Sequence, residues 1–205
     1  MPVRALVWDM DGTLLDSSEA VTAAFAAALA RIGGPVVAAA EVVSAYSLGP
    51  PEAILAHLAG RPLTTADTEE YYRELEVVRV SAYPGIAGVL RALRERGQPV
   101  AVSTGASSRA ARMLLAAAGL AVDILVGGDE VARPKPAADG LLRTAALLGV
   151  SPRECAYIGD APADMGAARA AGCHSAAAAW GHMFDAGQPC DSVVNTPADA
   201  LLLLE

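Results

Sequence analysis

The chain has no long apolar run, since no stretch of its 205 residues approaches the length of about 18 apolar residues that a membrane-spanning helix needs. The first apolar stretch is interrupted by Asp9, too early for an ordinary signal sequence. We therefore expect a cytoplasmic protein without a membrane partner. The length suits one domain, or one domain with an insert, that buries a substantial core.

Positive charge is also scarce. The formal net charge is -8, and Lys135 is the single lysine beside fourteen arginines. Proteins that bind a nucleic-acid backbone need clustered Lys and Arg, so we expect no nucleic-acid partner. An acidic protein can still bind a small phosphate where a local cation or a metal ion supplies the charge. Most lysines are solvated loop residues, but a chain that otherwise uses arginine raises the alternative that Lys135 is needed as a compact point charge.

Cysteines are few and odd in number. Cys155, Cys173 and Cys190 also lack the spacing of metal ligands. We expect them to be small buried hydrophobic residues in a reducing compartment, because neither a disulfide framework nor a zinc site fits this pattern.

The segment between Asp16 and Tyr83 has helical patterns and no convincing strand. Asp16 and Glu19 are spaced as a capping box, which predicts a helix from about residue 17. The predicted helices cover residues 17–31, 38–46, 51–58 and 64–80, and Gly and Pro separate them. The sequence therefore predicts a small all-helical insert over residues 16–82, which divides a second domain into residues 1–15 and 83–205.

Outside the insert, strands and helices alternate. The predicted strands cover residues 3–8, 99–103, 124–126, 156–158 and 175–179, and the predicted helices cover residues 86–96, 107–118, 137–148, 164–171 and 198–204. This alternation predicts an α/β fold, a Rossmann-like parallel sheet with helices on both faces. Ligands of such sheets bind beyond the carboxyl ends of the strands, where the strand order reverses.

The first predicted strand leads directly into Asp9-Met10-Asp11-Gly12-Thr13. Side chains two residues apart leave a strand on the same side, so Asp9 and Asp11 are expected to lie together. One carboxylate of such a pair can stay ionised as a nucleophile and metal ligand while the other carries a proton. A calcium loop is a poor alternative, because a third oxygen ligand before Gly12 and a closing Glu are absent. A solvated acidic turn remains open from this motif alone.

Polar residues also follow the other predicted strands. These are Thr104-Gly105, Arg133-Pro134-Lys135-Pro136, and Gly159-Asp160 with Asp164 shortly after. Each motif is weak alone, but together they are expected to meet at one edge of one sheet.

These motifs resemble those of the haloacid dehalogenase superfamily of aspartate-nucleophile phosphohydrolases. VWDMDGTLLDS is similar to its first motif, PVAVSTGAS to the second, RPKPAADGLL to the third and YIGDAPADMGAARAAG to the fourth. The resemblance covers nearly the whole chain and extends to the branch of phosphoglycolate phosphatases and β-phosphoglucomutases, in which a helical cap follows the first motif. It implies an enzyme that acts on a small phosphorylated metabolite.

The resemblance also implies roles for single residues. Asp9 would be the nucleophile that forms an aspartyl phosphate, and Asp11 the acid and then the base. Thr104 and Gly105 would bind the phosphoryl group, although relatives often carry Asn at the second position. Lys135 would neutralise charge on the nucleophile and the transferring group.

The same resemblance implies Mg²⁺ as cofactor. Its ligands would be Asp9, the main-chain carbonyl of Asp11 and Asp160. Asp164 would lie just outside, where it orients a metal-bound water or Lys135.

The implied function is Mg²⁺-dependent hydrolysis of a small phosphate monoester, of the phosphoglycolate phosphatase type. Asp11 disfavours the dehalogenases, which lack the second aspartate, and the absence of lysine from the insert disfavours the phosphonate-cleaving relatives. A sugar-phosphate mutase of the β-phosphoglucomutase type shares all four motifs and remains open. A non-enzymatic descendant that binds a metal or a partner also remains open, since a fold survives the loss of its chemistry.

Several further residues are candidates for contacts with the leaving group. Glu52 and His57 come from the insert near its Gly-Pro-Pro loop, and Arg109 and Arg133 could meet a substrate carboxylate. His182 could reach the pocket mouth. The insert is expected to close over the site by hinging near residues 14–16 and 82–84.

Overall fold

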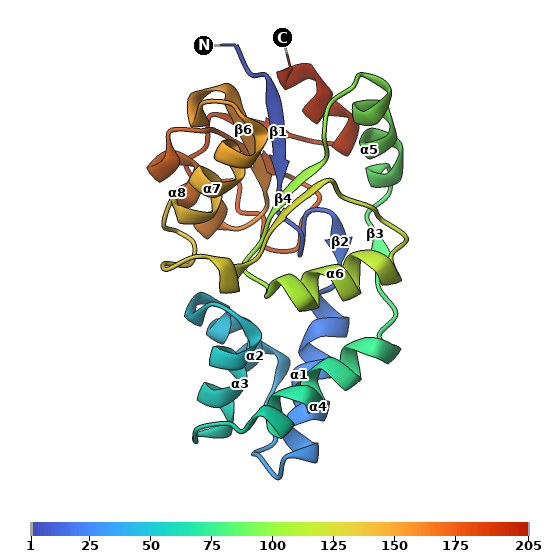
Figure 1. Cartoon of the computed structure of the whole chain (residues 1–205), viewed down its shortest axis with the longest axis vertical. Coiled ribbons are helices and arrows are strands. Elements are labelled where there is room, and N and C mark those ends of the chain that lie inside the picture. Colours follow the sequence, from blue (N-terminus) through green and yellow to red (C-terminus); the bar gives the residue numbers. More distant parts are fainter. Residues whose placement is uncertain (1, 205) are drawn as a thin grey trace.

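A six-stranded parallel sheet forms the centre of the computed structural model, which describes residues 2–204 (Figure 1). Its strands, in spatial order, are β5 (Ile124–Val126), β4 (Ala101–Ser103), β1 (Ala5–Trp8), β6 (Cys155–Gly159), β7 (His174–Ala178) and β8 (Ser192–Val194). All neighbouring strands are parallel. The α/β fold class predicted from the alternation is thus confirmed.

The chain changes direction across the sheet at β1. It runs from β1 to β4 and β5 on one side, then returns to β6, β7 and β8 on the other. The carboxyl ends of β1, β4 and β6 therefore border the crevice in which doubly wound sheets bind ligands.

Strand β1 is buried on both faces, as its unbroken apolar sequence predicts. Ala5 and Val7 belong to one apolar cluster, whereas Leu6 and Trp8 belong to another. Helices α7 (Asp139–Leu148) and α8 (Pro162–Ala171) pack on the first cluster, and α5 (Ile86–Glu95) and α6 (Ser108–Ala117) on the second (Figure 1). Because both faces of β1 are packed, the position of Asp9, the residue directly after this strand, is fixed.

Four α-helices gather beyond the carboxyl end of β1, opposite the two termini (Figure 1). The helical segments are α1 (Ser18–Arg31), α2 (Ala39–Ser44), the 3-10 helix η1 (Ala45–Leu48), α3 (Pro51–Ala59) and α4 (Thr65–Val77). Phe25 of α1 and Tyr71 of α4 stack with ring centroids 4.4 Å apart. The predicted helical insert is confirmed, and its own aromatic core holds α1 against α4.

Two short strands join the helical insert to the sheet. β2 (Leu15–Asp16) and β3 (Ser81–Ala82) pair antiparallel. The prediction that no strand lies between Asp16 and Tyr83 was therefore wrong at β3. Two residues are too few to show a period of two, so the sequence pattern gave no signal.

Three other local predictions were wrong. Asp16 does not cap α1, because it lies exposed in β2 and Ser17 occupies the N-cap position. The sixth strand β8 was missed, because only two of its three residues are apolar, whereas all three residues of the predicted edge strand β5 are apolar. The last predicted helix is the 3-10 helix η4 (Pro197–Leu203), after which Leu204 bridges to Val3.

The three cysteines are free thiols; Cys155 and Cys173 are buried, and Cys190 is partly exposed. Within residues 2–204, no helix combines the length and the apolarity needed to cross a membrane.

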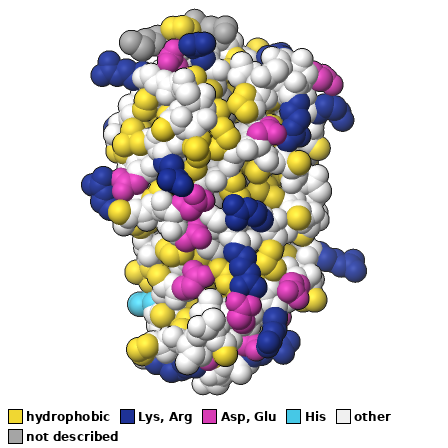
Figure 2. Space-filling view, in the orientation of Figure 1, with side chains coloured by type: hydrophobic (Ala, Val, Ile, Leu, Met, Phe, Trp, Pro, Cys, Tyr) yellow, Lys and Arg dark blue, Asp and Glu magenta, His cyan; other side chains and the backbone are white. Residues whose placement is uncertain are grey.

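The outer surface of the helical insert is charged. Figure 2 shows basic and acidic side chains side by side over this part of the molecule. Arg31 pairs with Glu74, and Arg73 with Glu70. The opposite face of α4 buries Tyr71, Tyr72 and Leu75. Helix α4 thus divides a charged exterior from an apolar interior.

Candidate active site

The loop after β1 is held tightly against Asp160. Gly12 adopts a φ of +82°, which favours glycine, and a Cβ there would lie 2.4 Å from Asp160 Oδ2. On the other side, a Cβ on Gly181 would lie 2.1 Å from Asp160 Cβ and 2.5 Å from the Gly12 carbonyl oxygen. Both glycines therefore allow three loops to approach one carboxylate more closely than side chains permit.

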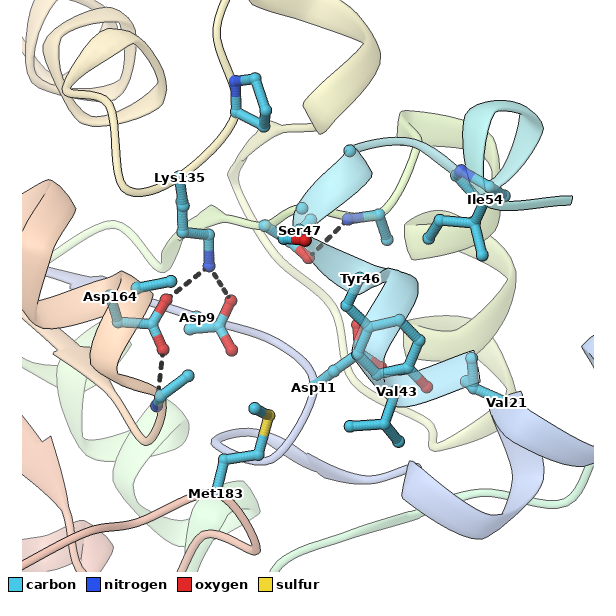
Figure 3. Close-up of a pocket in the computed structure, with 18 of the residues that line it drawn as sticks. Asp9, Asp11, Val21, Val43, Tyr46, Ser47, Ile54, Lys135, Asp164 and Met183 are labelled. Carbon is cyan, nitrogen blue, oxygen red and sulfur yellow. Dashed lines mark hydrogen bonds and ion pairs between the residues drawn. The ribbon is translucent and has the colours of Figure 1, made fainter. Parts of the chain in front are cut away.

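The side chain of Lys135 contacts three parts of the chain: Asp9 after β1, Tyr157 in β6 and Asp164 in α8. Its Nζ donates hydrogen bonds to Asp9 Oδ1 at 2.5 Å and Asp164 Oδ1 at 2.7 Å, which Figure 3 shows, and to the Tyr157 hydroxyl at 2.8 Å. The Tyr157 hydroxyl in turn donates to the carbonyl of Ser103 at 2.8 Å. Burial lowers the pKa of Lys135, but the carboxylates of Asp164 and Asp9 outweigh it and hold that pKa well above its usual value. The ammonium is therefore charged and fixed in place.

Asp9, Asp160 and Asp164 form a buried carboxylate cluster. One oxygen atom of each lies within 4.8 Å of the others, so the cluster can hold a metal ion. Asp164 uses both oxygens within the protein, because Oδ1 accepts from Lys135 and Oδ2 from the Ala161 amide at 3.0 Å. Within residues 2–204, Asp9 Oδ2 has no hydrogen-bond donor. The free oxygen and the all-carboxylate donor set fit a hard divalent cation.

Asp160 is oriented from two sides. Its Oδ2 accepts a hydrogen bond from the Met183 amide at 2.9 Å, and Thr13 Oγ1 lies 3.5 Å from Oδ1. His182 Nδ1 is 3.9 Å from Oδ2, so His182 lies beside the carboxylate cluster and is not among the residues that line the cavity. Burial raises the pKa of Asp160 to about 6.

The two aspartates of the first motif have different partners. Asp9 accepts from Lys135, whereas Asp11 Oδ1 accepts from the hydroxyl of Ser17 at 2.5 Å. Burial raises the pKa of Asp11, which favours the protonated acid. Burial also raises the pKa of Asp9 well above its usual value, and Lys135 opposes this shift. A metal cation beside Asp9 would act in the same direction as Lys135: it would lower the pKa of Asp9 and favour the carboxylate.

Thr104 and Gly105 lie at the carboxyl end of β4. The Thr104 amide donates to the carbonyl of Val126, and Thr104 Oγ1 accepts from the Ala106 amide at 3.2 Å. The hydroxyl proton of Thr104 therefore stays available for an anion in the cavity. Gly105 lines the same cavity.

A cavity of about 300 Å³ separates the sheet edge from the helical insert. Its sheet side contains all the residues predicted as catalytic, substrate-binding or metal-binding, and Asp164: Asp9, Asp11, Thr104, Gly105, Lys135, Asp160 and Asp164. The convergence predicted from the strand ends is therefore observed. This volume is at the lower end of the range for small-molecule sites.

Four predicted contacts for the leaving group lie elsewhere. Glu52 accepts a hydrogen bond from Tyr72 at 2.5 Å, and His57 is exposed on α3. Arg109 pairs with Glu69 on the surface. Arg133 pairs with Asp139 at 2.6 Å. These residues are absent from the cavity lining, as far as residues 2–204 show it.

Sequence reasoning missed three residues that complete the site. Tyr157 and Ser17 bind Lys135 and Asp11, and the Met183 amide binds Asp160. Tyr157 is two positions before Gly159 in β6, and positions two apart in a strand lie on the same face of the sheet. The face to which Tyr157 belongs could therefore be predicted from the sequence. Its partner could not, because Lys135 is 22 residues away and joins it only in the folded chain.

Comparisons with known proteins agree with the family resemblance and with the fold. The family model for haloacid dehalogenase-like hydrolases matches residues 3–172. The phosphoglycolate phosphatase of Xanthomonas campestris pv. campestris (strain 8004) is 33% identical over 193 residues, with 91% of this chain and 87% of that protein covered. The phosphoglycolate phosphatase of Aquifex aeolicus (strain VF5) is 29% identical over 208 residues, with 99% and 97% covered.

A solved structure is similar over the same length. The crystal structure of CbbY from Rhodobacter sphaeroides in complex with phosphate aligns with a TM-score of 0.83 at 23% identity, covering 98% of this chain and 99% of that one. At this identity the likeness concerns the fold, and it includes both the sheet and the helical insert. Taken with the family match over residues 3–172, these findings establish that the chain is an enzyme of the haloacid dehalogenase-like hydrolase family.

Proposed function

We propose that this protein is a Mg²⁺-dependent phosphatase that hydrolyses a small phosphate monoester through a phosphorylated Asp9. The main support is the position of Lys135, whose ammonium is fixed between Asp9 and Asp164 at the edge of a buried carboxylate cluster. Phosphoryl transfer depends mainly on positioning and charge neutralisation, and this arrangement supplies both. The curated relatives named phosphoglycolate phosphatase support the same reaction class.

In the first step, a carboxylate oxygen of Asp9 attacks the phosphorus atom and forms an aspartyl phosphate. The bond between phosphorus and the ester oxygen breaks at the same time. Lys135 lies 2.5 Å from Asp9 and offsets the negative charge that gathers around the transferring group. The Thr104 hydroxyl proton and the Gly105 amide donate to the phosphoryl oxygens.

Asp11 handles the proton in both steps. As the acid, it donates its proton to the leaving ester oxygen and becomes a carboxylate. That carboxylate then takes a proton from the water that attacks the aspartyl phosphate, which releases inorganic phosphate and restores Asp9. The hydrogen bond from Ser17 fixes the orientation of Asp11 for these transfers.

The ligands for Mg²⁺ would be Asp9, Asp160 and the main-chain carbonyl of Asp11. When bound, the ion supplies positive charge that stabilises the phosphoryl oxygens and keeps Asp9 ionised. Asp164 has both oxygens committed to Lys135 and the Ala161 amide, so it orients Lys135.

Residues 16–82 form a cap domain over a core of residues 1–15 and 83–205. The β2–β3 pair is the only two-stranded connection described between them in residues 2–204, and it is suited to act as the hinge. Cap closure would exclude water from the cavity between Asp9 and the helices.

The test is phosphate release from a panel of phosphate monoesters, measured with Mg²⁺ and again with a chelator. We expect release with Mg²⁺ and loss of release with the chelator, and readdition of Mg²⁺ should restore it. Acid-quenched protein should carry phosphate on Asp9. Failure to release phosphate or to label Asp9 under any metal condition would contradict the proposal and favour the mutase or the non-enzymatic alternative.

A further inference from the structure

The two walls of the cavity differ in charge. The sheet wall carries Asp9, Asp11, Lys135, Asp160 and Asp164. The opposite wall comes from α1 to α4 and is made largely of Val21, Phe25, Val43, Ile54 and Tyr71. Figure 3 shows this division, with the Lys135 ion pairs on one side and Val21, Val43 and Ile54 on the other.

The polar residues of the cap wall are neutral. They are Ser44, Tyr46 and Ser47, and none of the cap residues described along the cavity is charged. The arginines that the sequence suggested for a substrate carboxylate have other partners, because Arg109 pairs with Glu69 and Arg133 with Asp139 outside the cavity. The charge of the cap is therefore on its outer surface.

This distribution of charge limits which charged groups the leaving group of a substrate can carry. The sheet wall has four carboxylates and one ammonium, so the carboxylates and the phosphoryl group already balance the positive charge of Lys135 and of a bound divalent cation. A second anionic group on the substrate would lie against apolar side chains without a cationic partner. Burying an unpaired charge in this way is strongly unfavourable, whereas burying an apolar group is favourable.

Aromatic rings form part of the cap wall. Phe25 and Tyr71 are buried and stack on each other with an interplanar angle of 28°. Such a surface binds a flat or branched apolar body by area and by ring contacts. The volume of about 300 Å³ leaves room for one ring or a short branched chain beside the phosphoryl group.

We propose that the preferred substrate is the phosphate monoester of a neutral, largely apolar small alcohol. This inference rests on the phosphatase function proposed above, and it selects the leaving group within that function. Phosphoglycolate carries a carboxylate on its leaving group, so this cavity disfavours it.

The test compares three esters with Mg²⁺: benzyl phosphate, phosphoglycolate, and phosphoglycolamide, which replaces the carboxylate of phosphoglycolate with a neutral amide. We expect kcat/KM for benzyl phosphate to exceed that for phosphoglycolate by at least about tenfold, the size of effect that apolar pockets give. The kcat/KM for phosphoglycolamide should also exceed that for phosphoglycolate, because the two esters have nearly the same shape and only phosphoglycolate has a charged leaving group.

A cap variant makes the charge argument specific. Ser47 is exposed and lines the cavity, so Ser47→Arg can add a cation to the cap wall without disturbing the core. We expect Ser47→Arg to raise the phosphoglycolate to benzyl phosphate ratio of kcat/KM by about tenfold or more, as one new ion pair can. Ser47→Met is the control, since it adds similar length without charge and should not raise that ratio.

The possible failures are distinct. If phosphoglycolate is hydrolysed best with Mg²⁺, or if Ser47→Arg and Ser47→Met change the ratio equally, the inference about the leaving group is wrong and the phosphatase function stands. If no ester is hydrolysed and Asp9 is never phosphorylated, both proposals are wrong.

Discussion

The two walls of the cavity are built in different ways. On the sheet side, the ends of β1, β4 and β6 carry the polar residues, and hydrogen bonds connect Lys135, Tyr157 and Asp164 into one network. On the cap side, α1 to α4 present side chains that are held by packing, such as the stacked Phe25 and Tyr71. In the proposed reaction, the sheet fixes the groups that would act on any phosphate ester, and the helices offer a surface that can vary with the substrate.

The largest effect is expected from Asp9→Asn, which removes the proposed nucleophile from the sheet wall and keeps the shape of the side chain. Phosphate release should fall by at least about four powers of ten, as for other nucleophiles. The control is Glu76→Gln, the same chemical change at an exposed position on α4, which should leave the rate unchanged. Circular dichroism should show the same fold for both. Turnover that survives Asp9→Asn would exclude the covalent step.

Lys135→Ala should have the next largest effect. It removes the ammonium from Asp9 and Asp164, so kcat should fall by about two to three powers of ten. Arg133→Ala is the matched control, because Arg133 is two positions away and pairs with Asp139 on the surface. We expect that control to change kcat by less than about twofold. A near-normal rate for Lys135→Ala would make Lys135 an ordinary loop residue.

Tyr157→Phe should produce an intermediate effect on the same wall. The change removes the hydroxyl between Lys135 and the Ser103 carbonyl and leaves that carbonyl without this donor. We expect a loss of about 1–3 kcal/mol in the free energy of unfolding, measured by denaturant titration. A misplaced Lys135 should lower kcat by about tenfold and leave KM nearly unchanged. A rise in KM alone would instead assign Tyr157 to substrate binding.

The smallest effect is expected where cap and core meet at the surface. Arg109 on α6 and Glu69 on α4 form a two-point ion pair in which both side chains are nearly half exposed. Exposed pairs contribute little, so Glu69→Gln should shift the melting temperature by less than about 2 °C. Its kcat/KM should stay within about twofold of the wild type. A much larger loss would show that this pair holds the cap closed.

Periodic and positional signals in the sequence predicted most of the fold. Strand β5 and the helices α1, α3 and α6 were located within two residues of their observed bounds. Strands β3 (Ser81–Ala82) and β8 (Ser192–Val194) were missed, because they contain only one and two apolar residues, whereas all three residues of β5 are apolar. Asp16 fits a capping box locally, but strand pairing with Ser81 draws it into β2.

The site was predicted where a residue type had a chemical reason to follow a strand. Asp9, Asp11, Thr104, Lys135 and Asp160 converge as the sequence indicated, because parallel strands end at one edge. Tyr157 and Ser17 gave no such signal, since a tyrosine in a strand and a serine before a helix are ordinary residues.

The sequence by itself determined the α/β class, the helical insert and the set of polar residues that meet at the sheet edge, since these follow from periodicity and from motifs that are local in the chain. Only the tertiary structure decided which partners those groups have and which side chains face them. Lys135 meets Asp9 from 126 positions away. Glu52 and His57 were sequence candidates for contact with the leaving group, yet the packed helices α1 and α4 place Phe25 and Tyr71 along the cavity instead. Such contacts join segments distant in sequence, and the direction of each side chain depends on how whole elements pack.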